Sequence, residues 1–245
     1  PRLRRDTTAL LWRLKRRVYA RSRLTLIVPS RWMLELVRAS PLLSRFDVHR
    51  IPHGIDTKLF TPLPKNDARR ALGLPTDRQV VLFSATELNE PRKGLHLLVQ
   101  ALTGMAEPPL LALAGGGEPP RGVDARPLGL IEDDRVLAQA YAAADVLAVP
   151  TVADALTQTA IESIACGTPC VSFDRGGVTD VVAHGDTGYQ ARFGDTADLA
   201  RGLRAVLDDA DGFGPRCRRA AEEQYSIELQ VRRYLEVYER LLAVG

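Results

Sequence analysis

Short apolar, β-rich runs alternate with helical segments along most of this chain. The runs Val80-Val81-Leu82-Phe83 and Val146-Leu147-Ala148-Val149 are examples, and residues 134–143 between them have helical character. Alternation of this kind is typical of α/β folds, in which helices cover both faces of a mostly parallel sheet. The sequence therefore predicts a Rossmann-like, doubly wound parallel sheet.

The individual elements follow from apolar periodicity and from turn-forming residues between the runs. Strands are expected at residues 24–28, 48–51, 80–84, 110–114, 125–128, 146–149, 170–173 and 189–191. Helices are expected at residues 8–20, 31–38, 67–72, 94–102, 134–143, 158–166, 196–208, 216–224 and 227–243.

These elements group into parts of unequal size. Residues 65–225 hold six of the expected strands and are predicted to form one doubly wound unit. Residues 1–51 hold two expected strands, which cannot make a self-sufficient sheet. Residues 52–64, rich in Pro and turn formers, indicate a linker, and residues 226–245 carry a last helix.

Charge is unevenly distributed along the chain, although its formal net value is only +3. Residues 1–50 hold 13 Lys or Arg against 3 Asp or Glu, whereas the remainder holds 20 against 27. A basic portion on an acidic body indicates contact with something anionic. In residues 8–21, Leu11, Leu14 and Val18 share one helical face among arginines, a pattern that suits an anionic membrane surface. A core-facing helix with a solvated basic face is an equal alternative.

Other partners and locations receive less support. No nucleic-acid-binding motif is present. Three cysteines, Cys166, Cys170 and Cys217, match neither an even disulfide framework nor a common zinc spacing, and indicate reduced thiols. No apolar run approaches the roughly 18 residues that a membrane span needs. We therefore expect a cytoplasmic protein, with peripheral contact at the inner membrane face left open.

The stretch from Asp154 to Gly188 carries the most chemistry. Asp154 and Glu162 lie eight positions apart across the start of an expected helix, with Thr157-Gln158-Thr159 between them. Free amides at a helix N-terminus attract phosphate, and nearby carboxylates can hold sugar hydroxyls. This combination suits a nucleotide sugar.

Each of these residues also has a purely structural interpretation. Thr159 and Glu162 fit the S/T-x-x-E capping box of a helix start. Asp154 could be a solvent-facing loop acid, and Thr157 a simple helix cap. Gly115-Gly116-Gly117 could approach a phosphate, but a tight turn after a strand explains it better.

The same stretch resembles the donor-site signature of the GT-B glycosyltransferases, in the large retaining group 1 family with an E-x7-E motif. It is most similar to the branch in which D-N-L-P-Q replaces E-G-F-G-L, since this chain has Asp154-Ala155-Leu156-Thr157-Gln158. The resemblance implies a donor-binding lobe at residues 65–225 and a remnant of the N-terminal, acceptor-binding lobe at residues 1–51. Residues 52–64 would then be the hinge, and residues 226–245 the helix that crosses back.

The resemblance also implies roles for individual residues. Lys93, Asp154 and Glu162 would be catalytic: Lys93 would neutralise the donor phosphates, Asp154 would lie near the transferred sugar, and Glu162 would hold the ribose. The remaining donor-binding positions are Arg92, Gly129, Ile131, Leu156, Thr157, Gln158, Thr159, Gly176 and Gly177. In this family an Arg often lies six positions before the Lys, where this chain has Glu87. Either this branch acts without that Arg, or donor binding is weakened.

By resemblance, the expected activity is sugar transfer with retention from a UDP- or GDP-linked donor to a sugar or lipid-linked acceptor, as in polysaccharide biosynthesis. No cofactor is expected. No metal is expected either, because Glu132-Asp133-Asp134 and Asp209-Ala210-Asp211 lie in turn or helix-end contexts. One alternative is a non-catalytic nucleotide-sugar binding module, or half of a split enzyme that needs a partner acceptor lobe. A two-lobed 2-epimerase is a weaker alternative.

Overall fold

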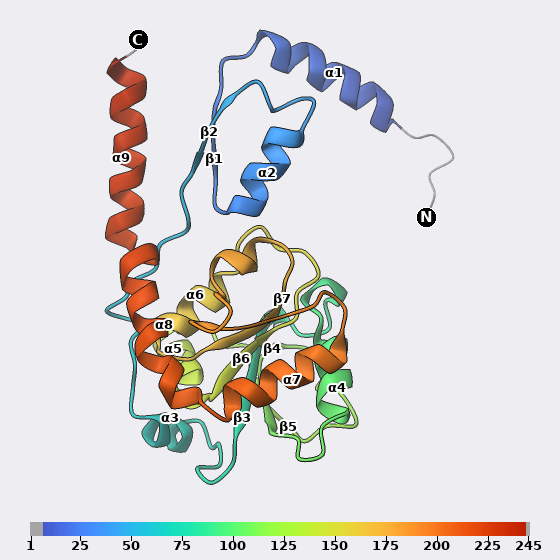
Figure 1. Cartoon of the computed structure of the whole chain (residues 1–245), viewed down its shortest axis with the longest axis vertical. Helices are drawn as coiled ribbons and strands as arrows, with labels where there is room; N and C mark the ends of the chain where they lie inside the picture. The colour runs from blue at the N-terminus through green and yellow to red at the C-terminus, as the bar shows by residue number, and fades with distance from the viewer. Residues whose placement is uncertain (1–6, 244–245) are drawn as a thin grey trace.

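A six-stranded parallel sheet forms the centre of the molecule (Figure 1). The computed structural model describes residues 7–243, apart from the side chains of residues 210 and 211. The strand order is β5-β4-β3-β6-β7-β8, and every neighbouring pair is parallel. The strands are β3 (Val80–Glu87), β4 (Leu110–Gly116), β5 (Ala125–Gly129), β6 (Val146–Val149), β7 (Cys170–Phe173) and β8 (Gly188–Ala191). The predicted doubly wound α/β fold is confirmed.

Two groups of helices cover the sheet. One group contains α4 (Leu95–Thr103) and α7 (Thr196–Leu207), which pack together. The other contains α3 (Lys65–Ala71), α5 (Asp134–Ala143), α6 (Gln158–Ala165) and α8 (Ala210–Tyr225). The chain moves from β3 to β4 in one direction across the sheet and from β5 to β6 in the other. Right-handed crossovers therefore put α4 and α5 on opposite faces.

Burial explains the continuous apolar runs of the sequence. The strands β3, β4, β6 and β7 are buried along most of their length. Strands that are covered on both faces read as unbroken apolar runs instead of alternating ones. Helical side chains such as Leu98, Ile161 and Leu199 complete this core and are fully buried.

The N-terminal portion is much smaller. It consists of α1 (Thr8–Arg21), β1 (Thr25–Val28), α2 (Arg31–Ala39) and β2 (Asp47–Arg50), and β1 and β2 form a separate two-stranded parallel sheet. Within α1 no residue is buried. The side chains of Leu11, Leu14 and Val18 are all half exposed or more. Within the described residues no side chain of this helix is buried, and the membrane-facing and core-facing interpretations both stay predictions.

Two adjacent segments join the portions. Past β2, the Gly54 N–H donates to Gln230 Oε1 at 3.0 Å, and Ile55 bridges to Ser226. The helix α9 (Ile227–Ala243) then extends away from the six-stranded unit, on the same side of it as the N-terminal portion (Figure 1). The boundaries proposed at residues 51, 64 and 225 stay predictions. No helix within residues 7–243 combines the length and the apolar character that crossing a membrane requires.

Most element bounds agree with the sequence predictions to within two residues, and α5, β6, β7 and α9 agree at both ends. The helix α8 is the main correction, because it begins at Ala210 instead of residue 216 and contains Pro215. Two 3-10 turns, η1 (Pro91–Lys93) and η2 (Gly177–Asp180), were not predicted. Elements this short have no periodicity to detect.

Candidate functional site

A cavity of about 310 Å³ opens at the carboxyl edge of the six-stranded sheet. It lies where the chain after β3 goes one way across the sheet and the chain after β6 goes the other, and open α/β sheets bind ligands at such switch points. The lining comes from the end of β3, the end of β4, the loop after β5, α5 and α6. Its residues are Ser84, Ala85, Thr86, Ala114, Gly115, Leu130, Ile131, Leu137, Gln158, Thr159 and Glu162.

Glu162 is the buried carboxylate of this cavity, with 6% of its surface exposed. Its Oε2 accepts a hydrogen bond of 2.7 Å from the hydroxyl of Tyr141 on α5. Burial raises the pKa of Glu162, and the hydrogen bonds from Tyr141 and Gln158 partly oppose that rise. A desolvated carboxylate that lines a cavity is typical of functional sites.

The capping-box interpretation of Glu162 is wrong. The helix α6 begins at Gln158, so Thr157 is the N-cap residue and Thr159 is already helical. Glu162 therefore lies too far along the helix to reach the N-cap amide, and it bonds to Tyr141 instead. The sequence placed the helix start correctly but assigned the cap two residues too late.

The N-terminus of α6 faces this region with its first amides outside the helical hydrogen-bond pattern. In the part of the chain that the structure describes, Thr157 makes no side-chain cap, and its buried Oγ1 has no hydrogen-bond partner. Gln158 and Thr159 line the cavity itself. The simple-capping interpretation of Thr157 is thus not what the structure has. The amides at this helix end would suit an anion, whereas the Thr157 hydroxyl is buried and Thr157 does not line the cavity.

Lys93 and Asp154 form an ion pair beside this helix end. Lys93 Nζ lies 3.1 Å from Asp154 Oδ2. The turn η1 that carries Lys93 is held against the loop after β6, because the Val152 N–H donates to the carbonyl of Arg92 at 2.9 Å. Gly94 allows this approach, since a Cβ there would lie 2.0 Å from the carbonyl oxygen of Pro150. Asp154 is therefore not the solvent-facing loop acid of the structural alternative.

The loop at Gly176 and Gly177 joins the same cluster. The Gly177 N–H donates to the carbonyl of Asp154 at 2.9 Å. A Cβ on Gly177 would lie only 1.8 Å from the carbonyl oxygen of Ala155. The structure thus brings together Lys93, Asp154 and both glycines around the loop that precedes α6, although none of the four lines the cavity of about 310 Å³.

The other predicted site residues lie outside this cluster. The guanidinium of Arg92 pairs with Glu90 at 2.5 Å and is largely exposed. Leu156 is buried in the hydrophobic core, so it can offer a ligand only its backbone. Ile131 lines the cavity, whereas Gly129 ends β5 before it.

Glu87, which stands where the resemblance implies an arginine, also lies near the cavity. Glu87 is the last residue of β3, and its Oε1 would lie 3.7 Å from a Cβ on Gly116, the residue after the cavity-lining Gly115. Gly115 itself lets β3 and β4 approach, since its Cβ would meet the carbonyl oxygen of Ala85 at 1.9 Å. The turn interpretation of the glycine triplet is therefore incomplete, because close strand contact also requires glycine here.

Sequence reasoning missed Ser84, Thr86 and Tyr141. A buried tyrosine hydroxyl needs a hydrogen-bond partner, and this rule was the one signal that could have drawn attention to Tyr141, which is fully buried. Nothing in the sequence indicated that its partner would be Glu162.

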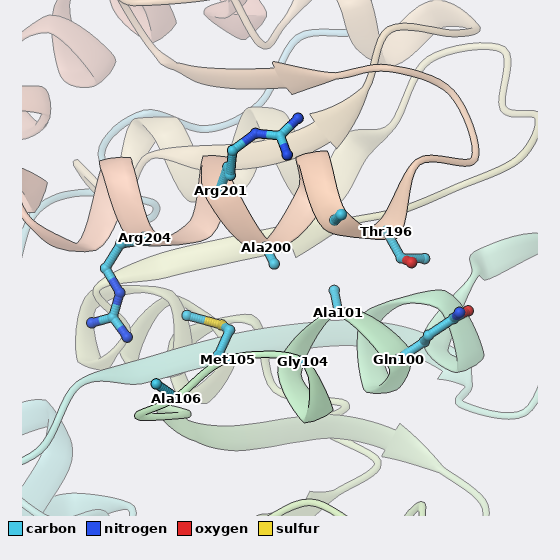
Figure 2. Close-up of a pocket in the computed structure, with 10 residues that line it drawn as sticks. Gln100, Ala101, Gly104, Met105, Ala106, Thr196, Ala200, Arg201 and Arg204 are labelled. Carbon is cyan, nitrogen blue, oxygen red and sulfur yellow. The ribbon is translucent and has the colours of Figure 1, made fainter.

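A second cavity, of about 480 Å³, lies between α4 and α7 on one face of the sheet. In Figure 2, Ala101 of α4 and Ala200 of α7 point toward one another, so small side chains leave the space open. Arg201 bonds to Asp198, and Arg204 donates to the carbonyl of Glu107. None of the predicted site residues lines this cavity. Within residues 7–243, no cluster of three or more His, Cys, Asp or Glu could hold a metal ion.

Known proteins that are similar to this chain identify its family. The family described as glycosyl transferases group 1 matches residues 78–209, which is more than half of the chain. The chain belongs to the glycosyl transferases group 1 family. The matched range contains every catalytic residue that the resemblance implied.

Relatives of this family member are longer. A D-inositol 3-phosphate glycosyltransferase from Stackebrandtia nassauensis is 33% identical over 200 residues, covering 73% of this chain and 44% of the relative. The chain thus spans less than half of that protein.

Solved structures agree on the fold. Sucrose-phosphate synthase from Thermosynechococcus elongatus superposes with a TM-score of 0.83 at 27% identity, covering 99% of this chain and 63% of the other. The Anabaena protein HepE, solved with UDP-glucose, gives 0.76 at 20% identity, covering 96% and 68%. Both likenesses extend over the N-terminal portion as well as the six-stranded unit.

Proposed function

We propose that this family member binds a nucleotide-diphosphate sugar in the cavity beside α6. As part of a two-lobed enzyme, it would transfer the sugar to an acceptor hydroxyl with retention of anomeric configuration. The buried Glu162 carboxylate, which lines a cavity at the switch point of the sheet, carries the proposal. Two names among the similar proteins support it: the Stackebrandtia relative is a glycosyltransferase, and the Anabaena structure contains UDP-glucose.

Each contact in the cavity suits one part of such a donor. Ribose hydroxyls would donate to Glu162. The diphosphate would accept from the free amides at the start of α6, beside the unpartnered Thr157 hydroxyl. Lys93 would turn from Asp154 toward the phosphates and stabilise the negative charge that develops as the diphosphate leaves.

Asp154 and the loop at Gly176 and Gly177, which are in backbone contact with each other, would together orient the sugar. The acceptor hydroxyl would attack from the face that the diphosphate leaves. The donor would be UDP- or GDP-linked, and the charge of the leaving group would be met by Lys93 and backbone amides without a metal ion.

Calorimetric titration with UDP, GDP and ADP tests this proposal. One nucleotide should bind, and Glu162→Gln should weaken it by about tenfold or more, because a hydrogen bond to a charged group contributes about 1.5–3 kcal/mol. Asp198→Asn is a matched control, since Asp198 is equally buried but lies outside the cavity. Wild-type affinity in Glu162→Gln would refute the assignment.

A second candidate is a donor-binding half that acts only with a separate acceptor lobe. One observation favours it: within residues 7–243, β1 and β2 form a separate two-stranded sheet that is too small to be stable alone. On this proposal, nucleotide binds but transfer needs a second chain. Transfer by the purified chain to a simple sugar acceptor would rule the half-enzyme out.

The exposed face of α1 supports a membrane-bound or lipid-linked acceptor at the cytoplasmic side. Leu11 and Leu14 are exposed beside Arg13, Arg16 and Arg17, and such helices lie on anionic bilayers. Sedimentation with phosphatidylglycerol vesicles, but not with phosphatidylcholine vesicles, is expected. Equal recovery with both vesicle types would contradict it.

A further inference from the structure

Tyr141 is a fully buried residue on α5 that does not line the cavity but contacts the cavity-lining Glu162. Its ring packs near Phe60, with centroids 6.3 Å apart, and its backbone carbonyl accepts from Thr168 Oγ1 at 2.8 Å. Its hydroxyl donates to Glu162 Oε2 at 2.7 Å. Both ends of the tyrosine are therefore fixed, and the position of its hydroxyl is set by the core of the protein.

We propose that Tyr141 is a positioning residue whose hydroxyl holds Glu162 as a fixed, ionised acceptor, and so sets a preference for ribonucleotides over 2′-deoxyribonucleotides. This inference rests on the proposed nucleotide site. It adds a residue that touches no ligand and acts through another side chain.

The direction of the hydrogen bond follows from the surroundings. Burial and the adjacent carboxylate raise the pKa of Tyr141 well above its ordinary value, so the phenol keeps its proton and donates. Ser84, which lines the same cavity, also lies within hydrogen-bonding reach of this hydroxyl. Glu162 therefore receives a donor from the core side, opposite to the space a ligand would fill.

A ribose presents two neighbouring hydroxyl donors, which an ionised carboxylate can accept. A protonated acid has fewer acceptor positions and carries a donor of its own. Burial works against ionisation of Glu162, as does the charge of Asp134 at the start of α5. The hydrogen bonds of Tyr141 and Gln158 act in the other direction. Cys166, which directly follows α6, is another titratable neighbour and keeps its thiol protonated, because burial raises its pKa to about 12.

Tyr141→Phe removes the hydroxyl and keeps the ring. Titration with UDP and with 2′-deoxy-UDP between pH 5 and 8.5 is the measurement. The wild type should prefer UDP by about tenfold, the scale of a hydrogen bond to a charged group. In Tyr141→Phe this preference should shrink to a fewfold, and the loss of UDP affinity on acidification should begin at a higher pH.

Tyr189→Phe is the matched control. The hydroxyl of Tyr189 donates to the Asp198 carboxylate at 2.9 Å, the same kind of bond outside the cavity. This variant should keep both the ribose preference and the pH profile of the wild type. If the role of Tyr141 were purely structural, Tyr141→Phe would lower thermal stability, as we expect Tyr189→Phe to do, but would change neither the ribose preference nor the pH profile.

A ligand-free readout separates this inference from the proposed function. Carboxyl ¹³C titration of Glu162 should show its pKa higher in Tyr141→Phe than in the wild type. An unchanged pKa, or an unchanged ratio of UDP to 2′-deoxy-UDP affinity, would overturn the inference while UDP binding by the wild type still supports the site. If the wild type binds no nucleotide, the proposed function fails and this inference fails with it.

If Tyr141→Phe does not fold, a fluorotyrosine at position 141 provides the second variant. It keeps the hydroxyl and makes it a stronger donor. The pKa of Glu162 should then fall below the wild-type value, and a rise or no change would contradict the proposal.

Discussion

The six-stranded unit and the N-terminal portion differ in how much apolar surface they bury. The unit from residue 65 to 225 has a continuous apolar core with fully buried side chains from every strand except β5. The N-terminal portion buries few apolar side chains, among them Val28, Val37 and Phe46. Hydrophobic burial is the main favourable term in folding, so stability concentrates in the larger unit.

Polar contacts tie the smaller portion to the larger one. The hydroxyl of Ser30 donates to the carbonyl of Ala155 at 2.6 Å, next to Asp154 of the candidate site. Arg31 and Arg50 both bond to the carboxylate of Asp180, at 3.1 Å each. The candidate cavity is thus built on a large apolar core, whereas the N-terminal portion is attached to it largely through hydrogen bonds and ion pairs.

Core truncation should show the largest difference. Phe173→Ala removes a fully buried ring from β7 and should cost about 3–5 kcal/mol of unfolding free energy. Phe46→Ala, at 8% exposure in the N-terminal portion, should cost less and leave the main transition in place. Urea unfolding followed by circular dichroism measures both, and equal costs would break the comparison.

Gly177→Ala comes next. The added Cβ would lie 1.8 Å from the carbonyl oxygen of Ala155, so the two loops must separate. We expect a loss of about 2 kcal/mol or more, since backbone clashes are among the severe single changes, together with weaker nucleotide binding. Gly104→Ala is the control, because its nearest Cβ contact is 3.5 Å. Calorimetry and thermal melting report both effects, and tight binding by Gly177→Ala would show that the loop contact is dispensable.

Asp180→Asn should loosen the joint between the portions without unfolding either. The carboxylate is buried, but Arg31 and Arg50 are 68% and 39% exposed, so the cost should be only about 1 kcal/mol. Hydrogen exchange should rise in residues 25–50 and stay constant in the central strands. Asp67→Asn, which breaks an exposed pair with Arg70, should change neither. Equal exchange gains in both portions would contradict a local effect.

Glu162→Gln should have the smallest effect on stability, and it should be favourable. Because burial raises the folded-state pKa of Glu162, the stability that its protonated form contributes is lost as pH rises through that pKa. The neutral glutamine should therefore match the wild type in acid and melt slightly higher near neutral pH. Melting curves from pH 4 to 8 test this, and a stability cost that grows with pH would reverse the sign.

The two regions also differ in how well sequence predicts them. The unbroken apolar run at β6 predicted its bounds to the residue, because strands covered on both faces have that pattern. For α1, amphipathicity identified an apolar face but not what covers it. The start of α8 was missed because Pro215, normally a breaker, lies inside the helix.

At the candidate site, sequence supplied the residues within one motif and missed the contacts between distant segments. Asp154 and Glu162 could be named from their spacing. Their partners, Lys93 and Tyr141, come from other elements, and the Tyr141 contact depends on how α5 packs on α6. Such pairings are set by tertiary packing, which local pattern does not encode.

The contacts of Gly54 and Ile55 with Gln230 and Ser226 hold the start of α9, so any rotation of this helix would pivot there. At about 1.5 Å per residue, the 17 residues of α9 extend roughly 25 Å from this point. A rotation of about 10° there would carry the far end of α9 through roughly 4 Å while hardly moving the residues at the pivot. The part of α9 displaced in this way contributes no residue to the lining of the candidate cavity.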